Sequence, residues 1–231
     1  MKFSLVIPCY NEGQNLNLLL KRCQELIDQS GCEIIIVNNG STDNTQAILR
    51  DILENGVHSF KYVDIPKNIG YGHGILQGLH AATGQYIGWT HADLQTNPLD
   101  CLEAWKILEK EPEAFVKGLR KGRGLFDIFF TSGMSLFETI LLKKPMRDIN
   151  AQPTIFSRDF IEHWTNPPSD FSIDLYAYYQ ALLLKKPIKR FSVYFGKRLH
   201  GKSSWNDGLL ARLRFIRRTI AFSFHMRNSN L

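Results

Sequence analysis

Short apolar segments alternate with amphipathic ones along most of the chain. Residues 3–7, 33–37 and 60–65 are segments of strand length, rich in apolar and β-branched residues and bounded by turn residues. Between the first two segments, apolar side chains recur at the spacing of one helix face: Leu16, Leu19, Leu20, Cys23, Leu26 and Ile27. Strands alternating with helices predict an α/β fold, with a Rossmann-like, mostly parallel central sheet and helices on both faces. In such a sheet, ligands bind at the carboxyl ends of the strands.

Residues 85–98 form the most informative stretch. It begins as a buried strand and then presents His91, Asp93 and Gln95 at alternate positions, which would place the three side chains on one side of a strand. Asn97 and Pro98 read as the cap and first residue of a helix. A carboxylate, an amide oxygen and an imidazole at a strand end can hold a hard divalent cation with its diphosphate. The alternative is a strand followed by an ordinary polar turn.

Three further loops fall at the same predicted edge of the sheet. The turns at 8–13 and 38–43 follow the first two strands, and Ser41 or Thr42 is expected to cap a helix that runs to about residue 54. Loop 68–74 contains three glycines and opens a helix, so its backbone amides can face an anion. The alternative for this loop is a flexible helix entry.

Composition limits the class of protein. The 231 residues suffice for one large α/β domain, or for a domain with a short extension, and 44% of them are hydrophobic. A net charge of +6 favours an anionic partner such as a nucleotide, a lipid phosphate or an acidic membrane surface. The four cysteines lack CxxC spacing, which indicates reduced thiols in the cytosol. No signal peptide is expected, and no segment has 18 uninterrupted apolar residues, so none is expected to span a bilayer.

Two segments could face a membrane. The basic, glycine-containing loop in 114–124 is either a solvated surface loop or a loop that binds phosphate. The phenylalanine-rich helix after it, 126–142, either belongs to the core or faces a membrane. The tail, 207–231, carries an apolar helical stripe with arginines beside it, which is suited to an anionic membrane. Packing against the main domain or a homodimer would explain the stripe equally simply.

Four motifs in this order resemble family 2 glycosyltransferases with the GT-A fold. They are Ile7-Pro8-Cys9-Tyr10-Asn11-Glu12, Val37-Asn38-Asn39-Gly40-Ser41-Thr42-Asp43, Asn68-Ile69-Gly70 and Ala92-Asp93-Leu94-Gln95. Within the family, the chain is similar to polyprenyl-phosphate sugar transferases of the dolichyl-phosphate mannose synthase type. The family usually has Asp-Asp at Asn38-Asn39 and Asp-Ala-Asp at 91–93. The resemblance implies a GT-A domain over 1–206, followed by the basic amphipathic tail over 207–231.

The resemblance also implies a set of site residues. Those expected to bind the nucleotide sugar are Pro8, Tyr10, Glu12, Asn38, Asn39, Asn68, Gly70, His91 and Ala92. Asp93 and Gln95 are expected to hold Mg²⁺ or Mn²⁺, with His91 on the metal or on the nucleotide. The residues expected to take part in catalysis are Asp93, Asp148, Asp174, Arg198 and Lys202. The side chains of Arg198 and Lys202 are expected to contact the departing diphosphate. Asp174 lies near a helix start, where the helix dipole alone would favour a carboxylate.

The implied activity is inverting transfer from a nucleotide diphosphate sugar to a polyprenyl phosphate or lipid-linked acceptor, for cell-surface glycan synthesis. The protein would lie peripherally on the cytoplasmic face of a membrane. A lipid phosphate needs no catalytic base, whereas a saccharide hydroxyl would need one, with Asp148 or Asp174 as candidates. The alternatives are extension of a saccharide and non-catalytic binding of a nucleotide sugar. Nucleic-acid binding is not expected, because no aromatic and basic residues interleave on a strand platform.

Overall fold

One mixed sheet organises the chain. The computed structural model describes residues 3–54, 60–201 and 209–228. Its seven strands lie in the order β3-β2-β1-β4-β6-β5-β7, and only β6 runs antiparallel to its neighbours. The strands are β1 (Phe3–Cys9), β2 (Glu33–Asn39), β3 (Phe60–Ile65), β4 (Tyr86–Trp89), β5 (Phe115–Lys121), β6 (Thr154–Ser157) and β7 (Ile188–Tyr194). The predicted mostly parallel sheet is confirmed.

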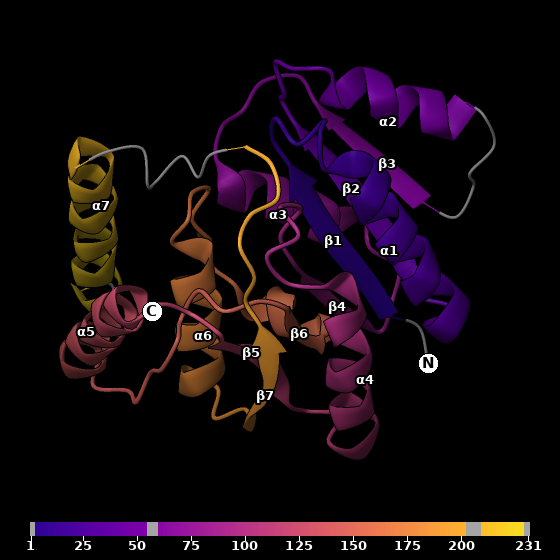
Figure 1. The fold of residues 1–231 in the computed structure, drawn as a ribbon. Coiled ribbons are helices and arrows are strands. Elements are labelled where there is room, and N and C mark those ends of the chain that lie inside the picture. The colour runs from indigo at the N-terminus through magenta and orange to yellow at the C-terminus, as the bar shows by residue number, and fades with distance from the viewer. Residues whose placement is uncertain (1–2, 55–59, 202–208, 229–231) are drawn as a thin grey trace.

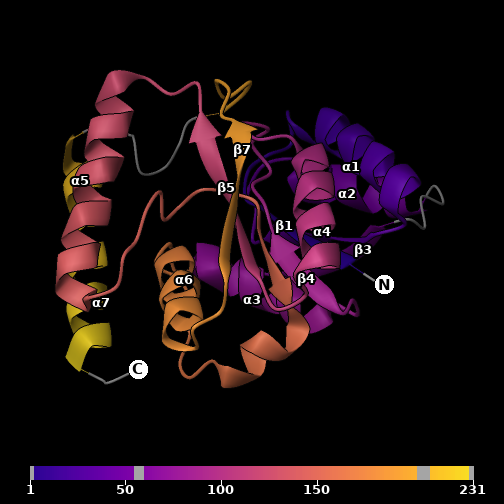
Figure 2. The same ribbon diagram turned by 90° about the horizontal axis from the view of Figure 1, so that it is seen from below.

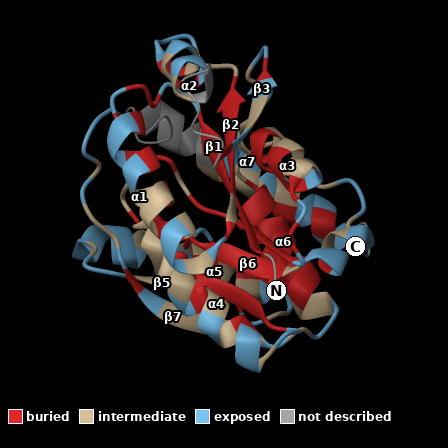
Figure 3. Cartoon of the chain, turned by 90° about the vertical axis from the view of Figure 1, so that its right-hand side faces the viewer, coloured by how far each residue is buried: buried red, intermediate tan, exposed pale blue. Residues whose placement is uncertain are grey.

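Helices cover both faces of this sheet, which explains why its inner strands are apolar throughout rather than alternating. Every residue of β1 is buried, and the centre of the molecule is buried around it (Figure 3). On one face pack α1 (Leu16–Ser30), α2 (Thr45–Glu54) and α4 (Cys101–Lys110); on the other pack α3 (Tyr71–Ala81) and α6 (Ile173–Leu183). Short 3₁₀ helices, η1 (Pro98–Asp100) and η2 (Arg158–His163), precede α4 and follow β6.

Two long helices form an outer pair beside α6. Helix α5 (Leu125–Leu142) and helix α7 (Leu209–Asn228) pack against each other along one side of the molecule (Figures 1 and 2). At their interface the carboxyl group of Glu138 is fully buried, with Oε1 2.8 Å from Ser223 Oγ. The opposite side of α5 is apolar and exposed, with Phe129 79% and Ile140 70% accessible.

Helix α5 corrects the expectation that no segment could span a bilayer. By length and composition alone its 18 residues are apolar enough to do so, and 22% of them are buried within the protein. The expectation relied on an uninterrupted apolar run, and Asp127 and Glu138 interrupt this one. Glu138 faces α7, so the charged position lies on the protein side of the helix.

The carboxyl ends of the parallel strands meet at one edge, as predicted. The register pairs Cys9 of β1 with Asn38 of β2, and β1 also pairs with β4. The loop after β3 lies against the end of β2, because a side chain at Gly40 would meet the backbone nitrogen of Asn68. Gly40 also has a φ of 68°, which favours glycine. This edge therefore collects the loops in which most of the predicted site residues lie.

Two helix starts test the predicted caps. Asn97 and Pro98 begin η1 as expected, with a capping box between Asn97 and Asp100. The expected cap of α2 is wrong, because that helix begins at Thr45 and its amide donates to the carboxylate of Asp43 at 2.9 Å. The hydroxyl of Ser41 instead accepts from the backbone of Asn11, so it ties the two edge loops together.

Candidate active site

An arginine and two carboxylates form the centre of the edge. Arg198 lies 2.9 Å from Asp93 Oδ2 and 3.4 Å from Glu12 Oε1. These three residues come from the loops after β7, β4 and β1. Burial raises the pKa of Glu12, opposed by a hydrogen bond from Asn15 and by the charge of Arg198. The positive charge of the arginine thus offsets part of the repulsion between the two carboxylates.

A turn in the loop after β4 positions Asp93, whereas the sequence predicted that a continuing strand would do so. The strand ends at Trp89, so the alternation predicted for residues 91, 93 and 95 is wrong. Leu94 has a φ of 58°, which turns the chain, and the amide of Gln95 donates to Asp93 Oδ1 at 3.1 Å. The Gln95 side chain donates to the carbonyl of Gly196, so it joins this loop to the one that carries Arg198.

His91 points to a different neighbour. Its ring stacks on Tyr71 with 5.5 Å between centroids, and its Nδ1 lies 3.4 Å from the Tyr71 hydroxyl. The ring of Phe171 also stacks with Tyr71, with 4.7 Å between centroids. Burial, together with the charges of Asp174 and Asp93, raises the pKa of Tyr71 far above its usual range, so the hydroxyl stays protonated. His91 is therefore part of an aromatic stack at the start of α3.

The paired asparagines are fixed by different partners. Asn38 donates to Asp64 at 2.8 Å and accepts from the amide of Ser41. Asn39 donates to the carbonyl of Gly70 at 3.0 Å, and its own Oδ1 is buried with no hydrogen-bond partner among the residues that the structure describes. Asn39 and Gly70, both expected to bind the donor, thus lie in direct contact. Asn68, in the same loop as Gly70, is half-buried and adjoins Gly40 of the loop after β2.

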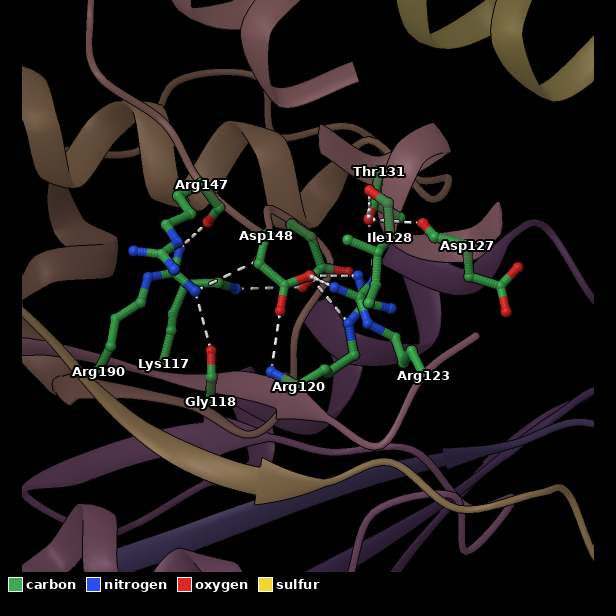
Figure 4. A network of polar contacts seen from close by, with 11 residues as sticks. Lys117, Gly118, Arg120, Arg123, Asp127, Ile128, Thr131, Arg147, Asp148 and Arg190 are labelled. Carbon is green, nitrogen blue, oxygen red and sulfur yellow. Dashed lines mark hydrogen bonds and ion pairs between the residues drawn. The ribbon is translucent and has the colours of Figure 1, made fainter. Parts of the chain in front are cut away.

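A second cluster surrounds Asp148 (Figure 4). Its carboxylate accepts from the backbone amide of Arg120 at 2.9 Å and from the Arg120 guanidinium at 2.5 and 2.9 Å, and Arg123 lies 3.5 Å away. Burial would raise the pKa of Asp148, but the hydrogen bonds and charge of Arg120 and the charge of Arg123 outweigh it and lower the pKa. Asp148 has a φ of 45°, a conformation that a non-glycine residue adopts only when its surroundings hold it.

Asp174 belongs to a third group of polar residues, a buried network. Its Oδ1 accepts from Gln152 Nε2 at 2.6 Å and from Trp89 Nε1 at 3.2 Å, and Lys117 Nζ lies 3.9 Å away. Asp174 is 2% exposed. The network joins α6 to β4, to β5 and to the segment before β6. The helix dipole alone therefore does not explain why a carboxylate is found at position 174.

The remaining predicted residues occupy simpler positions. Pro8 and Ala92 are buried, and Tyr10 is exposed at the rim of the edge. Lys202 lies outside the residues that the structure describes.

The sequence reasoning missed several polar residues that hold these clusters. Arg120 and Arg123 were part of the basic loop but were not assigned to Asp148. Lys117 carried a recognisable signal, since a lysine within an apolar strand needs a buried partner. Tyr71 carried none, because its role depends on the position of His91 twenty residues later in the chain.

Comparison with known proteins places this geometry in a family. The model described as Glycosyl transferase family 2 matches residues 4–173. The chain is 27% identical over 168 residues to an undecaprenyl-phosphate 4-deoxy-4-formamido-L-arabinose transferase of Photorhabdus laumondii, covering 70% of this chain and 50% of that protein. It is 30% identical over 130 residues to a dodecaprenyl-phosphate galacturonate synthase of Rhizobium johnstonii, covering 54% and 38%. The chain thus spans half or less of the length of these two relatives.

Two solved structures have a similar fold. One is the mannosyltransferase PcManGT of Pyrobaculum calidifontis in complex with GDP-Man and Mn²⁺, with a TM-score of 0.69 and 19% identity, covering 96% of this chain and 64% of that one. The other is glucosyl-3-phosphoglycerate synthase of Mycobacterium tuberculosis with Mn²⁺, UDP and its product, also at 0.69 and 19%, covering 98% and 79%. The expected GT-A fold is confirmed.

Proposed function

Because the chain belongs to family 2 of the glycosyltransferases, we propose that it transfers a sugar from a nucleotide diphosphate sugar to a polyprenyl phosphate or lipid-linked acceptor. The names of two relatives, which act on undecaprenyl and dodecaprenyl phosphate, support this acceptor class. The nucleotides in the solved neighbours support the donor class. We place this transfer in cell-surface glycan synthesis, as a proposal that rests on the polyprenyl phosphates named in the same relatives.

The donor would bind across the carboxyl edge of β1, β2 and β4. Pro8, Tyr10 and Glu12 would line one side of the nucleotide, and Asn38, Asn39 and the loop at Asn68 and Gly70 the other. The contact between Asn39 and Gly70 supports this arrangement, since it brings two of the motifs into one wall. His91 and Ala92 would adjoin the diphosphate, and His91 is supported there by Tyr71.

The residues near Asp93 fit a hard divalent cation, Mg²⁺ or Mn²⁺. Asp93 offers a carboxylate. The side-chain amide of Gln95 donates a hydrogen bond through Nε2 to the carbonyl of Gly196, so the Oε1 atom of Gln95 is the end that can face an ion. The described residues contain no group of three His, Cys, Asp or Glu side chains able to hold a metal. The remaining ligands would be water and donor oxygens, which is how Mg²⁺ is often bound. Such an ion would neutralise negative charge on the diphosphate.

Arg198 would act on the departing diphosphate. In this structure its guanidinium bridges Asp93 and Glu12. The guanidinium also matches phosphate oxygens in geometry, so Arg198 would pair with the diphosphate of a bound donor. Charge grows on those oxygens as the bond to the sugar breaks, so Arg198, together with Lys202, would stabilise the transition state more than the bound donor.

The ion pairs and hydrogen bonds of the two candidate bases, Asp148 and Asp174, favour an acceptor that reacts without a catalytic base. Asp148 is held as an ionised group by Arg120 and Arg123, and its lowered pKa makes it a weak base. Asp174 already receives two hydrogen bonds on Oδ1 and lies near Lys117. A phosphate oxygen is anionic without a base and can attack the anomeric carbon from the face opposite the leaving group, which inverts its configuration. The pairing of Asp148 with arginines is the observation that carries this choice of acceptor.

A peripheral position on the cytoplasmic face of a membrane would suit this acceptor. The exposed apolar side of α5 would enter the lipid surface, with α7 beside it and the basic loop around Lys121 and Arg123 at one end. A homodimer through the same side of α5 is the alternative arrangement.

A screen of nucleotide sugars tests the proposal. UDP-, GDP- and dTDP-sugars would be added singly, with and without Mn²⁺, and the rise in melting temperature measured. The proposal predicts that one nucleotide stabilises the protein, that Mn²⁺ increases the effect, and that the same donor supports transfer to undecaprenyl phosphate. Binding without any transfer would favour the non-catalytic alternative, and transfer to a saccharide hydroxyl would favour the extending enzyme.

A further inference from the structure

Lys117 is a charged residue within the core of the sheet. It lies in the middle of β5, opposite Thr154 of β6, and its side chain is completely inaccessible to solvent. Its ammonium group donates to Thr154 Oγ1 at 2.7 Å. A buried lysine is unfavourable unless a partner offsets the loss of hydration, so the surroundings of this one must supply a charge.

That charge comes from Asp174 on α6. Lys117 Nζ lies 3.9 Å from Asp174 Oδ1 and is the only cation within ion-pair distance of it among the described residues. The other two groups on Oδ1, from Trp89 and Gln152, are neutral donors. If the lysine were neutral, Asp174 would be a buried anion held by dipoles alone.

Other charged groups also face Lys117. Arg190 of β7 and Arg120 of β5 disfavour its positive charge, and Asp148, from the loop between α5 and β6, favours it. Figure 4 places Lys117 beside Arg190 and Asp148. The lysine thus lies between the Asp148 cluster and the Asp174 network, and its protonation state affects both.

Asp174 is in turn linked electrostatically to the donor side of the site. Its charge and that of Asp93 both act on the Tyr71 hydroxyl, which contacts His91. Trp89, which donates to Asp174, is the last residue of β4 and precedes the loop that carries Asp93. A change in the position or charge of Asp174 would therefore be transmitted to the loop that holds the diphosphate.

We propose that Lys117 is a positioning residue for sugar transfer, whose ammonium group holds the Asp174 side chain in place and whose deprotonation sets the alkaline limit of activity. This rests on the transferase activity proposed above. Burial, partly opposed by Asp174, lowers the pKa of Lys117 to about 7. The lysine is then charged below neutral pH and loses its proton as the pH rises through that value. Surface lysines keep theirs to about pH 10.

Two measurements test the proposal. In the first, lysine labelled with ¹³C at Cε is followed by NMR from pH 5 to 10 in the full chain, and the Lys117 signal is identified by its loss in Lys117→Met. We expect it to titrate near pH 7, and to titrate at lower pH in Asp174→Asn, which removes the favourable charge but keeps the shape. A Lys117 signal that titrates near pH 10, or one that Asp174→Asn leaves unchanged, would overturn the proposal.

The second measurement is the pH profile of kcat/KM for transfer to undecaprenyl phosphate. We expect the wild-type value to fall about tenfold for each pH unit above 7. Lys117→Arg, which stays charged, should remove that limb, and Lys117→Met should reduce kcat at least tenfold at pH 6.5. Lys186→Met is the matched control, since Lys186 pairs with Glu113 outside the site, and should keep the wild-type profile. An unchanged limb in Lys117→Arg, or full activity in Lys117→Met, would contradict the proposal.

The two proposals fail in different ways. A wild-type protein that hydrolyses the nucleotide sugar but transfers nothing to undecaprenyl phosphate contradicts the proposed acceptor alone. The NMR titration and the pH profile of that hydrolysis then still decide the role of Lys117. If Lys117→Arg does not fold, Asp174→Asn and the NMR titration supply the decision.

Discussion

Glu138 gives the sharpest prediction about stability, because its burial changes the pH at which it becomes charged. Ser223 Oγ lies 2.8 Å from Glu138 Oε1 and 2.8 Å from the carbonyl oxygen of Thr219. Ser223 can donate to either oxygen, but one hydroxyl has one proton, so it serves only one of the two acceptors at a time. Burial raises the pKa of Glu138 from 4.5 to about 7, and a hydrogen bond donated by Ser223 to the carboxylate partly opposes this rise. Glu138 is thus neutral when α7 is docked in mildly acidic solution.

The direction of the pH effect follows from that raised pKa. Between pH 4.5 and 7 the folded protein holds a proton that the unfolded chain has released, so the free energy of unfolding falls as the pH rises. At about 1.4 kcal/mol per pKa unit, the loss is at most about 3 kcal/mol above pH 7. Glu138→Gln is a permanent mimic of the neutral form. Relative to wild type it should gain about 2 kcal/mol between pH 5 and pH 8.

Thermal melts at pH 5, 6, 7 and 8 measure this effect. For a chain of this length, a gain of about 2 kcal/mol raises the melting temperature by about 4–8 °C. Glu162→Gln, the same change at an exposed position, is the control and should follow the wild-type pH dependence. If the melting temperatures of Glu138→Gln and wild type stay parallel across this range, Glu138 is not a buried neutral acid and the reasoning is wrong.

Three further predictions concern the site and the membrane. Asp93→Asn should abolish transfer and the effect of Mn²⁺ on donor binding, because it removes the only carboxylate of the motif; full activity of this variant in EDTA would contradict the metal assignment. Arg198→Ala should lower kcat by more than it raises KM for the donor, since the guanidinium acts on developing charge; a change confined to KM would limit Arg198 to binding. Phe129→Glu should reduce flotation with anionic liposomes, while Leu18→Glu, the same kind of change at an exposed position on α1, should not. If both float as well as wild type while Phe129→Glu turns a dimer into a monomer, α5 is a contact between two copies.

The strands and the edge of the sheet could be predicted because they depend on local pattern. Residues 34–37 are apolar throughout, and β2, which extends this run to Glu33 on one side and Asn39 on the other, is buried at every position except the half-buried Glu33. Motifs that follow such strands necessarily fall at one edge of a parallel sheet, which is why Glu12 and Asp93 were placed correctly near each other. Arg198 was expected at the same site, but its contacts with both carboxylates could be found only in the structure.

The charge states of the acids could not be predicted in the same way. Asp148 and Arg120 are 28 residues apart, and only the tertiary fold brings them to 2.5 Å. The family resemblance made Asp148 a candidate base for a saccharide acceptor, whereas its arginine partners lower its pKa. The alternation of His91, Asp93 and Gln95 failed for a related reason, since one left-handed residue, Leu94, changes the direction of the backbone.

The choice of acceptor is the central claim, and two lipids that differ by one phosphate test it most directly. With the donor found by the nucleotide screen and Mn²⁺ present, transfer would be measured to undecaprenyl phosphate and to undecaprenol at equal concentration, by chromatography of the labelled lipid. Because neither Asp148 nor Asp174 is free to act as a base, we predict a labelled sugar phosphodiester from undecaprenyl phosphate and no product from undecaprenol. Equal transfer to both lipids, or transfer to undecaprenol alone, would contradict this account of the site.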